Sequence, residues 1–218
     1  MLEAINLSCV RGARLLFSEL SFSLVQGTLL QITGPNGSGK TSLLRIICGL
    51  TAPENGAITW QGASINSLGE DYSRNLTYIG HRNGVKEELT SVENLRVAAG
   101  LCGVELTKAR ATQALADVGL AGREELPTRF LSEGQQRRSA LARLITSGTT
   151  LWVLDEVLAS LDASAVNMVE RLIEGHLGNG GMAIVTTHQL LNVSGVSLQR
   201  LELATEVSSG SERPGLPT

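Results

Sequence analysis

The sequence predicts an α/β fold in which an antiparallel β layer and an inserted helical subdomain accompany a parallel sheet. Short, fully apolar runs such as Leu151–Leu154 are typical of strands that are buried on both faces of a parallel sheet. Near the N-terminus, residues 2–9 alternate apolar and polar side chains and residues 15–25 are strand-rich, which favours an antiparallel layer. Between residues 91 and 118 the apolar side chains recur with the period of a helix.

The remaining elements follow from the same patterns. Strands are expected at residues 28–33, 57–60, 76–79, 151–154 and 182–186. Helices are expected at residues 41–48, on both sides of a break at Gly103, at residues 131–144 and at residues 162–173. Ser91, Thr107 and Asp162 are predicted N-caps. We expect residues 1–206 to form a single domain, with residues 81–130 as its helical subdomain, and the tail 207–218 to be disordered.

Composition narrows the class of protein. A net charge of −3 and a pI near 5.7 argue against a protein that binds nucleic acid through its charge, and 3% aromatic residues leave few side chains to stack on bases. The three cysteines (Cys9, Cys48 and Cys102) have neither metal-binding nor disulfide-framework spacing, which favours a reducing compartment. The N-terminus has no secretory signal pattern, and no run of about 18 apolar residues predicts a transmembrane span.

A glycine-rich loop connects the strand expected at residues 28–33 to the helix expected at residues 41–48. Glycines in this context let successive backbone N–H groups face a phosphate at the positive end of the helix dipole. Lys40 is then expected to reach the β- and γ-phosphates of a nucleotide, and the Thr41 hydroxyl to bind Mg²⁺. The alternative is a glycine-rich turn beside a chance lysine. The predicted nucleotide-binding residues of this loop are Gly34, Pro35, Asn36, Gly37, Ser38, Gly39, Lys40, Thr41 and Ser42.

Polar residues close two of the expected parallel strands. Asp155 and Glu156 follow one apolar strand, and His188 follows the next. Because ligands bind at the carboxyl ends of parallel strands, these side chains are expected to converge on the phosphates held by Lys40. Asp155 would bind Mg²⁺, Glu156 would polarise an attacking water and His188 would donate a hydrogen bond to the γ-phosphate. Alternatively, the two acids are solvated residues at a strand end and His188 is a turn residue.

The segment Leu131–Gln135 has the sequence Leu-Ser-Glu-Gly-Gln. It forms an ordered set of motifs with the glycine-rich loop, the strand followed by Asp155 and Glu156, the segment Ser160-Leu161-Asp162, and His188. This set resembles the ATP-binding cassette (ABC) ATPases over about residues 2–203. The resemblance implies a P-loop NTPase core that binds ATP and Mg²⁺ and hydrolyses ATP in a head-to-tail homodimer. It also implies that Ser132, Gly134, Gln135 and Asp162 lie at the ATP bound by the second subunit. Ser132 can act as a helix N-cap at the same time.

Three positions depart from the common pattern of this family. Arg11 stands where an aromatic side chain usually stacks on adenine; its guanidinium could stack on a base or could be a solvated loop residue. His81 replaces a glutamine near Mg²⁺, and its imidazole could accept a hydrogen bond from metal-bound water only when neutral. Val157 replaces a proline after the catalytic glutamate, which affects loop rigidity and removes no reactive group.

Several segments narrow the resemblance further. Those around Arg11, Tyr78–His81, Leu89–Leu95 and Thr186–Gln189 are similar to the ATP-binding subunits of cytochrome c maturation systems, which export haem. This implies polytopic membrane partners, contact near residues 81–88 and a peripheral position on the cytoplasmic face of the inner membrane. Composition and spacing do not themselves indicate haem. An ATPase of another exporter, or an ATP-gated clamp with little hydrolysis, stays open as an alternative.

Overall fold

The computed structural model describes residues 1–159, 161–189 and 191–204, and two sheets organise them. The first is antiparallel, with the strand order β2-β1-β4-β5. Its strands are β1 (Leu2–Arg11), β2 (Arg14–Leu24), β4 (Asn55–Trp60) and β5 (Ala63–Ser64). The antiparallel layer that the alternating N-terminal pattern predicts is therefore confirmed.

The second sheet is parallel, with the order β6-β7-β8-β3-β9. Its strands are β3 (Thr28–Thr33), β6 (Leu76–Ile79), β7 (Leu151–Asp155), β8 (Met182–Thr186) and β9 (Ser197–Glu202). The register aligns Ile79 with Leu154, Leu154 with Val185, and Val185 with Gln31. The residues that follow these positions therefore meet at one edge of the sheet.

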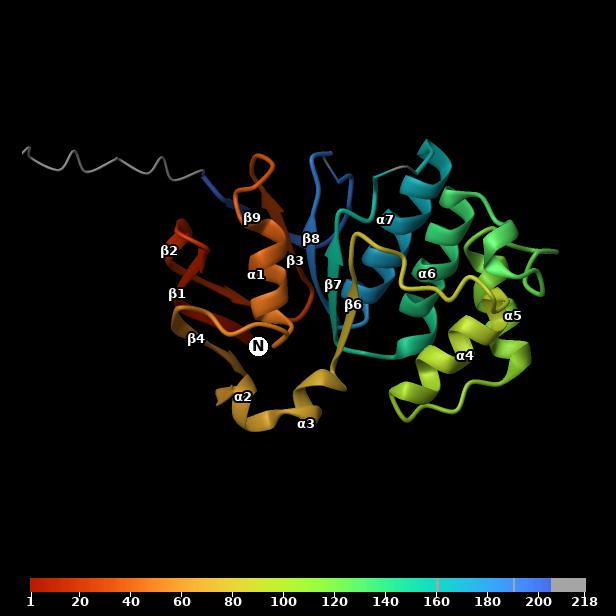
Figure 1. Ribbon diagram of the computed structural model, residues 1–218, viewed down its shortest axis with the longest axis horizontal. Coiled ribbons are helices and arrows are strands. Elements are labelled where there is room, and N and C mark those ends of the chain that lie inside the picture. The colour runs from red at the N-terminus through yellow and green to blue at the C-terminus, as the bar shows by residue number, and fades with distance from the viewer. Residues whose placement is uncertain (160, 190, 205–218) are drawn as a thin grey trace, which may run out of the picture.

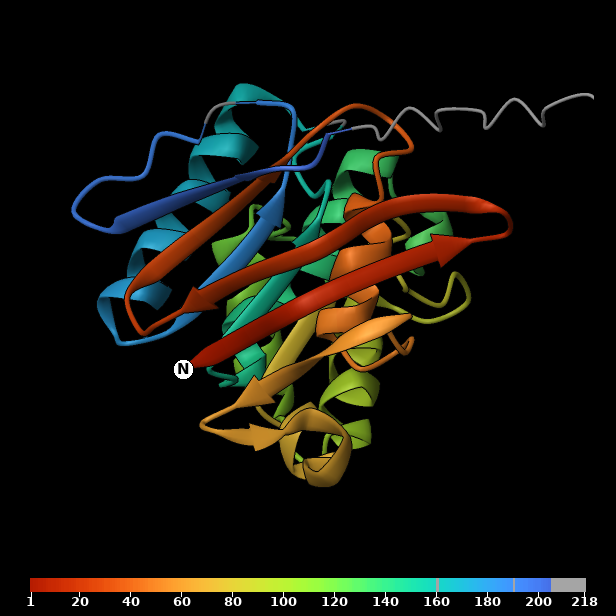
Figure 2. The ribbon, with the colours of Figure 1, turned by 90° about the vertical axis from the view of Figure 1, so that its left-hand side faces the viewer.

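Alternation along the parallel strands divides the apolar core into two clusters. Leu30 and Ile32 pack with helix α1 (Lys40–Ile47) and the antiparallel sheet, whereas Leu29 packs with the cluster on the opposite face. That face carries α4 (Ser91–Leu101), α5 (Lys108–Asp117), α6 (Glu133–Ser147) and α7 (Ala163–Gly178). Figure 1 accordingly shows α1 between the two sheets and α6 and α7 beyond β7 and β8. In Figure 2 the antiparallel sheet stands in front of α1.

Most of the strands and longer helices expected from the sequence are present, and several short or exposed elements were not predicted. These are α2 (Ile65–Leu68), α3 (Glu70–Ser73), the 3₁₀ turn η1 (Thr128–Phe130), β5 and the edge strand β9. The tail 207–218 lies outside the described residues. None of the helices in the described ranges combines the length and the apolar composition of a membrane span.

The helix caps give one correction. Thr107 and Asp162 cap α5 and α7 as predicted, but the N-cap of α4 is Thr90, so the prediction of Ser91 is wrong. The Thr90 hydroxyl accepts from the Glu93 N–H at 3.1 Å, and the Glu93 carboxylate accepts from the Thr90 N–H at 2.8 Å. This reciprocal capping box satisfies two backbone donors, whereas Ser91 is the first helical residue and is buried.

Candidate active site

The glycine-rich loop joins the end of β3 to the start of α1 through a tight turn. Gly34, Gly37 and Gly39 have φ angles of 142°, 80° and 101°, which a residue with a side chain rarely adopts. A Cβ at Gly34 would also collide with the Leu203 carbonyl. Gly39 is the N-cap of α1 and has no side-chain hydrogen bond that covers the first N–H groups of the helix. These N–H groups are thus available to an anion at the positive end of the helix dipole.

Lys40 is held inside this loop. Its ammonium group donates to the carbonyls of Gly34 at 2.8 Å and Pro35 at 3.2 Å, and the side chain is only 5% exposed. The Ser38 hydroxyl is also buried and has no hydrogen-bond partner. A buried hydroxyl without a partner costs free energy unless a ligand satisfies it. The loop therefore fits a phosphate, which can take hydrogen bonds from Ser38, from Lys40 and from the backbone.

The two acids at the end of β7 have different surroundings. Asp155 is 1% exposed; its Oδ1 accepts from the Thr186 hydroxyl at 2.7 Å, and its Oδ2 accepts from the Tyr78 hydroxyl at 3.4 Å. Burial, reinforced by the charge of Asp155, raises the pKa of Tyr78 to about 12, so the phenol stays a donor. Asp155 is thus fixed by hydroxyl groups from both neighbouring strands.

Glu156 points toward the phosphate loop. Its Oε1 lies 3.8 Å from the Lys40 ammonium nitrogen and 3.6 Å from Nε2 of His188. The backbone of Glu156 has a φ of 51°, and its N–H donates to both the hydroxyl (2.9 Å) and the carbonyl (3.1 Å) of Thr186. These bonds hold an otherwise unfavourable left-handed conformation. The structure therefore brings Glu156 and His188, which follow two parallel strands, together with Lys40 at the start of α1.

A hollow opens beside these groups, and β2 forms part of its wall. It is lined by Leu16, Asn36, Gly37, Gly39, Lys40, Thr41, Ser42 and Glu156. Sequence reasoning missed Leu16 and Arg14. The Nη1 atom of Arg14 lies 3.7 Å from the point that a Cβ on Gly37 would occupy. The sequence carries no clear signal for either residue, because their approach to the loop depends on how β2 lies over it and the β1–β2 register shifts next to Leu16.

Two predicted residues have less direct relations to this site. Arg11 is exposed on the β1–β2 hairpin and pairs with Arg14 across it. Among the described contacts, Arg14 approaches the glycine-rich loop and Arg11 does not. His81 is exposed and follows β6 by two residues. Its backbone carbonyl accepts from Arg137, and no described contact joins its imidazole to Asp155 or Glu156.

The Leu-Ser-Glu-Gly-Gln segment lies at the start of α6, on the opposite face of the parallel sheet from α1 (Figure 1). Ser132 caps α6: its hydroxyl accepts from the Gln135 N–H at 3.3 Å, and the Gln135 side chain accepts from the Ser132 N–H at 3.0 Å. Asp162 caps α7 and pairs with Arg138 of α6 at 3.1 Å. Its pKa is lowered, first by the Ser164 hydroxyl that donates to it. The sheet separates these residues from the glycine-rich loop of the same chain.

The donor set also indicates how a cation could bind. In the described ranges, no group of three or more His, Cys, Asp or Glu side chains could hold a metal ion. Thr41, Ser42 and Glu156 bring side-chain oxygens to the hollow beside the loop, and Asp155 directly precedes Glu156. Oxygen ligands such as those of Thr41 and Asp155 suit the hard cation Mg²⁺. Since Mg²⁺ commonly completes its coordination with substrate phosphates and water, the residues present fit a cation that arrives with a nucleotide.

Comparison with known proteins agrees with this geometry. A family model described as "ABC transporter" matches residues 17–159, which include the glycine-rich loop, the Leu-Ser-Glu-Gly-Gln segment and the acids that end β7. The chain belongs to the ABC transporter family. This membership confirms the resemblance that the ordered motifs indicate.

Three curated relatives of this ABC protein share one name. The chain is 54% identical to the cytochrome c biogenesis ATP-binding export protein CcmA of Nitrosospira multiformis, over 93% of this chain and 98% of that protein. It is 52% identical to CcmA of Nitrosomonas europaea, over 94% and 96% of the two chains. For CcmA of Escherichia coli the identity is 45%, over 93% and 96%.

Solved structures show the same ABC fold. An ATP-binding subunit of an ABC transporter superposes with a TM-score of 0.83 at 25% identity, over 95% of this chain and 88% of that chain. The dimeric, post-hydrolysis state of the ATP-binding cassette MJ0796 bound to ADP and Pi has a TM-score of 0.82 at 22% identity, over 95% and 97%. The predicted fold class, an ABC-type core with an antiparallel layer and helices, is confirmed.

Proposed function

We propose that this chain is the ATP-hydrolysing subunit of a membrane ABC complex that exports or delivers haem in cytochrome c maturation. The position of the Glu156 side chain is the observation that supports ATP hydrolysis most directly. Its carboxylate lies at the mouth of the phosphate loop, between the Lys40 ammonium and the His188 imidazole. A carboxylate there is suited to polarise a water that attacks the terminal phosphate.

Each side chain at the site has a role that its surroundings support. The N–H groups at the start of α1 and the Lys40 ammonium would hold the phosphates, as Lys40 exchanges its loop carbonyls for phosphate oxygens. Thr41 and Asp155 would hold Mg²⁺, which neutralises phosphate charge as the bond to the leaving group breaks. His188 would donate a hydrogen bond to the oxygen on which charge develops. His81 would accept a hydrogen bond from metal-bound water when its imidazole is neutral.

A second subunit would complete the site. Ser132, Gly134 and Gln135 lie at a helix N-terminus that the sheet separates from the glycine-rich loop of the same chain. A helix N-terminus favours an anion, so these residues suit ATP held by another copy. Asp162, tied to α6 by Arg138, would lie near the same interface. The dimeric cassette MJ0796, which shares the fold, supports a dimer of this kind.

The enzymatic proposal is tested with the isosteric substitution Glu156→Gln. We expect turnover at saturating Mg·ATP to fall by roughly a hundredfold or more, because an amide cannot take a proton from water. ATP affinity should stay near the wild-type value, since Lys40 and the loop are unchanged. Equal turnover in the two proteins would contradict the motor and favour the alternative, a clamp that ATP closes with little hydrolysis.

The role in cytochrome c maturation rests on the CcmA relatives, whose shared name describes an ATP-binding export protein of cytochrome c biogenesis. With this role, the chain would sit at the cytoplasmic face of the inner membrane as a peripheral subunit bound to polytopic partners. An apolar face supports such a contact: on α4, Val97 is 49% and Leu101 is 85% exposed. A cavity beside it is lined in part by Ala98, Val104 and Arg143.

The partners are tested by mass spectrometry of the proteins that co-purify with the tagged chain from gently solubilised membranes. We expect membrane subunits of cytochrome c maturation, and we expect Leu101→Lys to weaken their recovery without loss of ATP binding. Recovery of the membrane proteins of an unrelated exporter would be consistent with an ATPase subunit but would contradict the proposed role in haem export. Recovery of no membrane protein at all would favour the soluble clamp.

A further inference from the structure

Arg137 of α6 is a buried arginine whose hydrogen bonds go to two separate loops. Its side chain is 5% exposed. The Nη1 group donates to the Gly80 carbonyl at 2.8 Å and to Oδ1 of Asn83 at 3.1 Å, and it lies 3.5 Å from the His81 carbonyl. Nε donates to the Val157 carbonyl at 3.3 Å, and Nη2 donates to the Asp155 carbonyl at 3.4 Å.

These acceptors belong to the segments that follow the last paired residues of β6 and β7, although Asp155 still pairs with Thr186 of β8. The pairing between the two strands ends at Ile79 and Leu154. The segment 80–83 carries His81, and the segment 155–157 carries the two acids of the proposed active site. Beyond these residues, the two segments are joined by hydrogen bonds from the Arg137 guanidinium instead of by β-sheet hydrogen bonds. Arg137 itself belongs to α6.

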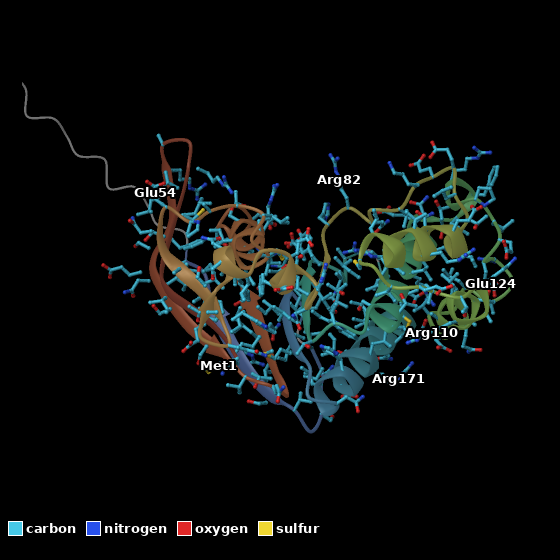
Figure 3. All side chains as sticks on the ribbon, turned by 90° about the horizontal axis from the view of Figure 1, so that it is seen from below. Met1, Glu54, Arg82, Arg110, Glu124 and Arg171 are labelled. Carbon is cyan, nitrogen blue, oxygen red and sulfur yellow. The ribbon has the colours of Figure 1, made fainter. Side chains whose placement is uncertain are left out.

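The charge and shape of Arg137 both suit this place. Burial lowers the pKa of its guanidinium, and the negative charge of Asp155 opposes that shift more than any other group does. A planar guanidinium presents five N–H donors in fixed directions, so it can reach acceptors on both sides. A lysine offers its donors from one point. Arg138, the next residue, points instead to Asp162. Arg82, beside His81, is exposed and projects into solvent (Figure 3).

We propose that Arg137 is a positioning residue that fixes segments 80–83 and 155–157 to each other and to α6. A displacement of α6 then moves His81 and the acid pair as one unit. The hydrolytic consequence rests on the proposed roles of Asp155 and Glu156; the mechanical link does not. Asn83 supports the link from the loop side, because its amide oxygen is the one side-chain acceptor among these bonds.

The test compares Arg137→Lys and Arg137→Gln with Arg96→Gln, a control on α4 whose guanidinium bonds the Leu106 carbonyl away from both loops. We expect kcat to fall roughly tenfold to a hundredfold in both Arg137 variants, while the Kd for ATP stays within about twofold. Asn83→Ala should shift kcat in the same direction by less. Arg96→Gln should leave both constants unchanged.

Hydrogen exchange without nucleotide separates positioning from general support of the fold. In the Arg137 variants, we expect amide exchange to accelerate at residues 81–84 and 156–158, with the central strands β3 and β8 protected as in wild type. Wild-type kcat and exchange in both variants would overturn the proposal. Exchange that rises equally in β3 and β8 would also overturn it, because Arg137 would then support the fold as a whole. If Glu156→Gln kept full turnover, the proposed chemistry would fail while this exchange pattern would still report on the link.

Discussion

Arg11 and Arg14 lie opposite each other on the β1–β2 hairpin, and only the second has a described approach to the phosphate loop. The motif comparison selects Arg11 because of its position in the sequence, whereas the fold places the Arg14 guanidinium against Gly37. The distance between a side chain and the loop depends on how the hairpin folds over it. That information is not present in either residue's neighbours along the chain.

The two arginines form a matched pair for measuring nucleotide affinity. We expect Arg14→Ala to weaken ATP binding by roughly two- to fivefold, because it removes a cation that lies beside the site. Arg11→Ala should weaken it less. Isothermal titration with ATP on each variant checks this, and a larger effect at Arg11 would restore the assignment that the sequence indicates.

His176 is a histidine remote from the site, and it links stability to pH. Its ring stacks on Trp152 with centroids 3.8 Å apart, and its Nε2 lies 3.2 Å and 3.1 Å from the carbonyls of Thr150 and Met182. Burial lowers its pKa from the ordinary value of 6.5. The folded protein therefore binds this proton less readily than the unfolded chain does. The stabilising effect is complete above about pH 6.5 and is lost as the pH falls below that value.

Thermal unfolding between pH 8 and pH 5 tests this linkage. We expect the Tm of His176→Gln to fall less steeply on acidification than the Tm of wild type, although its Tm at pH 8 is lower because the stack on Trp152 is lost. Parallel slopes for wild type and His176→Gln would show that His176 does not carry the linkage.

At the scale of elements, the capping box of α4 shows how one helix start is chosen over its neighbour. Thr90 and Glu93 bond each other reciprocally, while the buried Ser91 hydroxyl has no partner. A capping box at Ser91 would need the side chain of Asn94, three residues later. The amide of Asn94 instead donates to the carbonyls of Lys86, Leu89 and Thr90. The helix therefore begins after Thr90.

Alanine substitutions separate the two candidate caps. We expect Thr90→Ala to lower the free energy of unfolding by about 1 kcal/mol, because it removes the cap. Ser91→Ala should change it little, since the lost hydroxyl makes no hydrogen bond. Urea denaturation measures both variants, and an equal loss at the two positions would contradict this assignment of the cap.

The elements that could be predicted are those whose burial leaves a pattern in the sequence. The strands β3, β7 and β8 are almost entirely buried, β6 alternates between buried and half-buried residues, and all four positions match the prediction closely. The edge strand β9 is mostly exposed, so it carries no such pattern. Yet β9 leads to Leu203, whose carbonyl closes the space behind Gly34. The sequence could predict the glycine, but not the strand that makes the glycine necessary.

At the scale of the whole molecule, the parallel sheet separates two groups of candidate site residues. Lys40, Glu156 and His188 gather on the side of α1, whereas Ser132 begins α6 on the opposite face. In the proposed dimer, one chain would therefore supply half of each of two sites. This division explains why the motif order could be predicted from the sequence, while the distance between the motifs could not: that distance follows from which face of the sheet each helix covers.

The measurement that tests this division most directly is ATP turnover in mixtures of two inactive variants, Lys40→Ala and Ser132→Arg. Each alone should hydrolyse little, with ATP binding to isolated Ser132→Arg kept. Random mixing gives dimers with one intact composite site, so turnover should recover to about a quarter of wild type if the sites act independently. Such recovery would show that Lys40 of one copy and Ser132 of another act at the same site. A mixture that stays as inactive as its components, although mixed dimers form, would contradict a site shared between two copies.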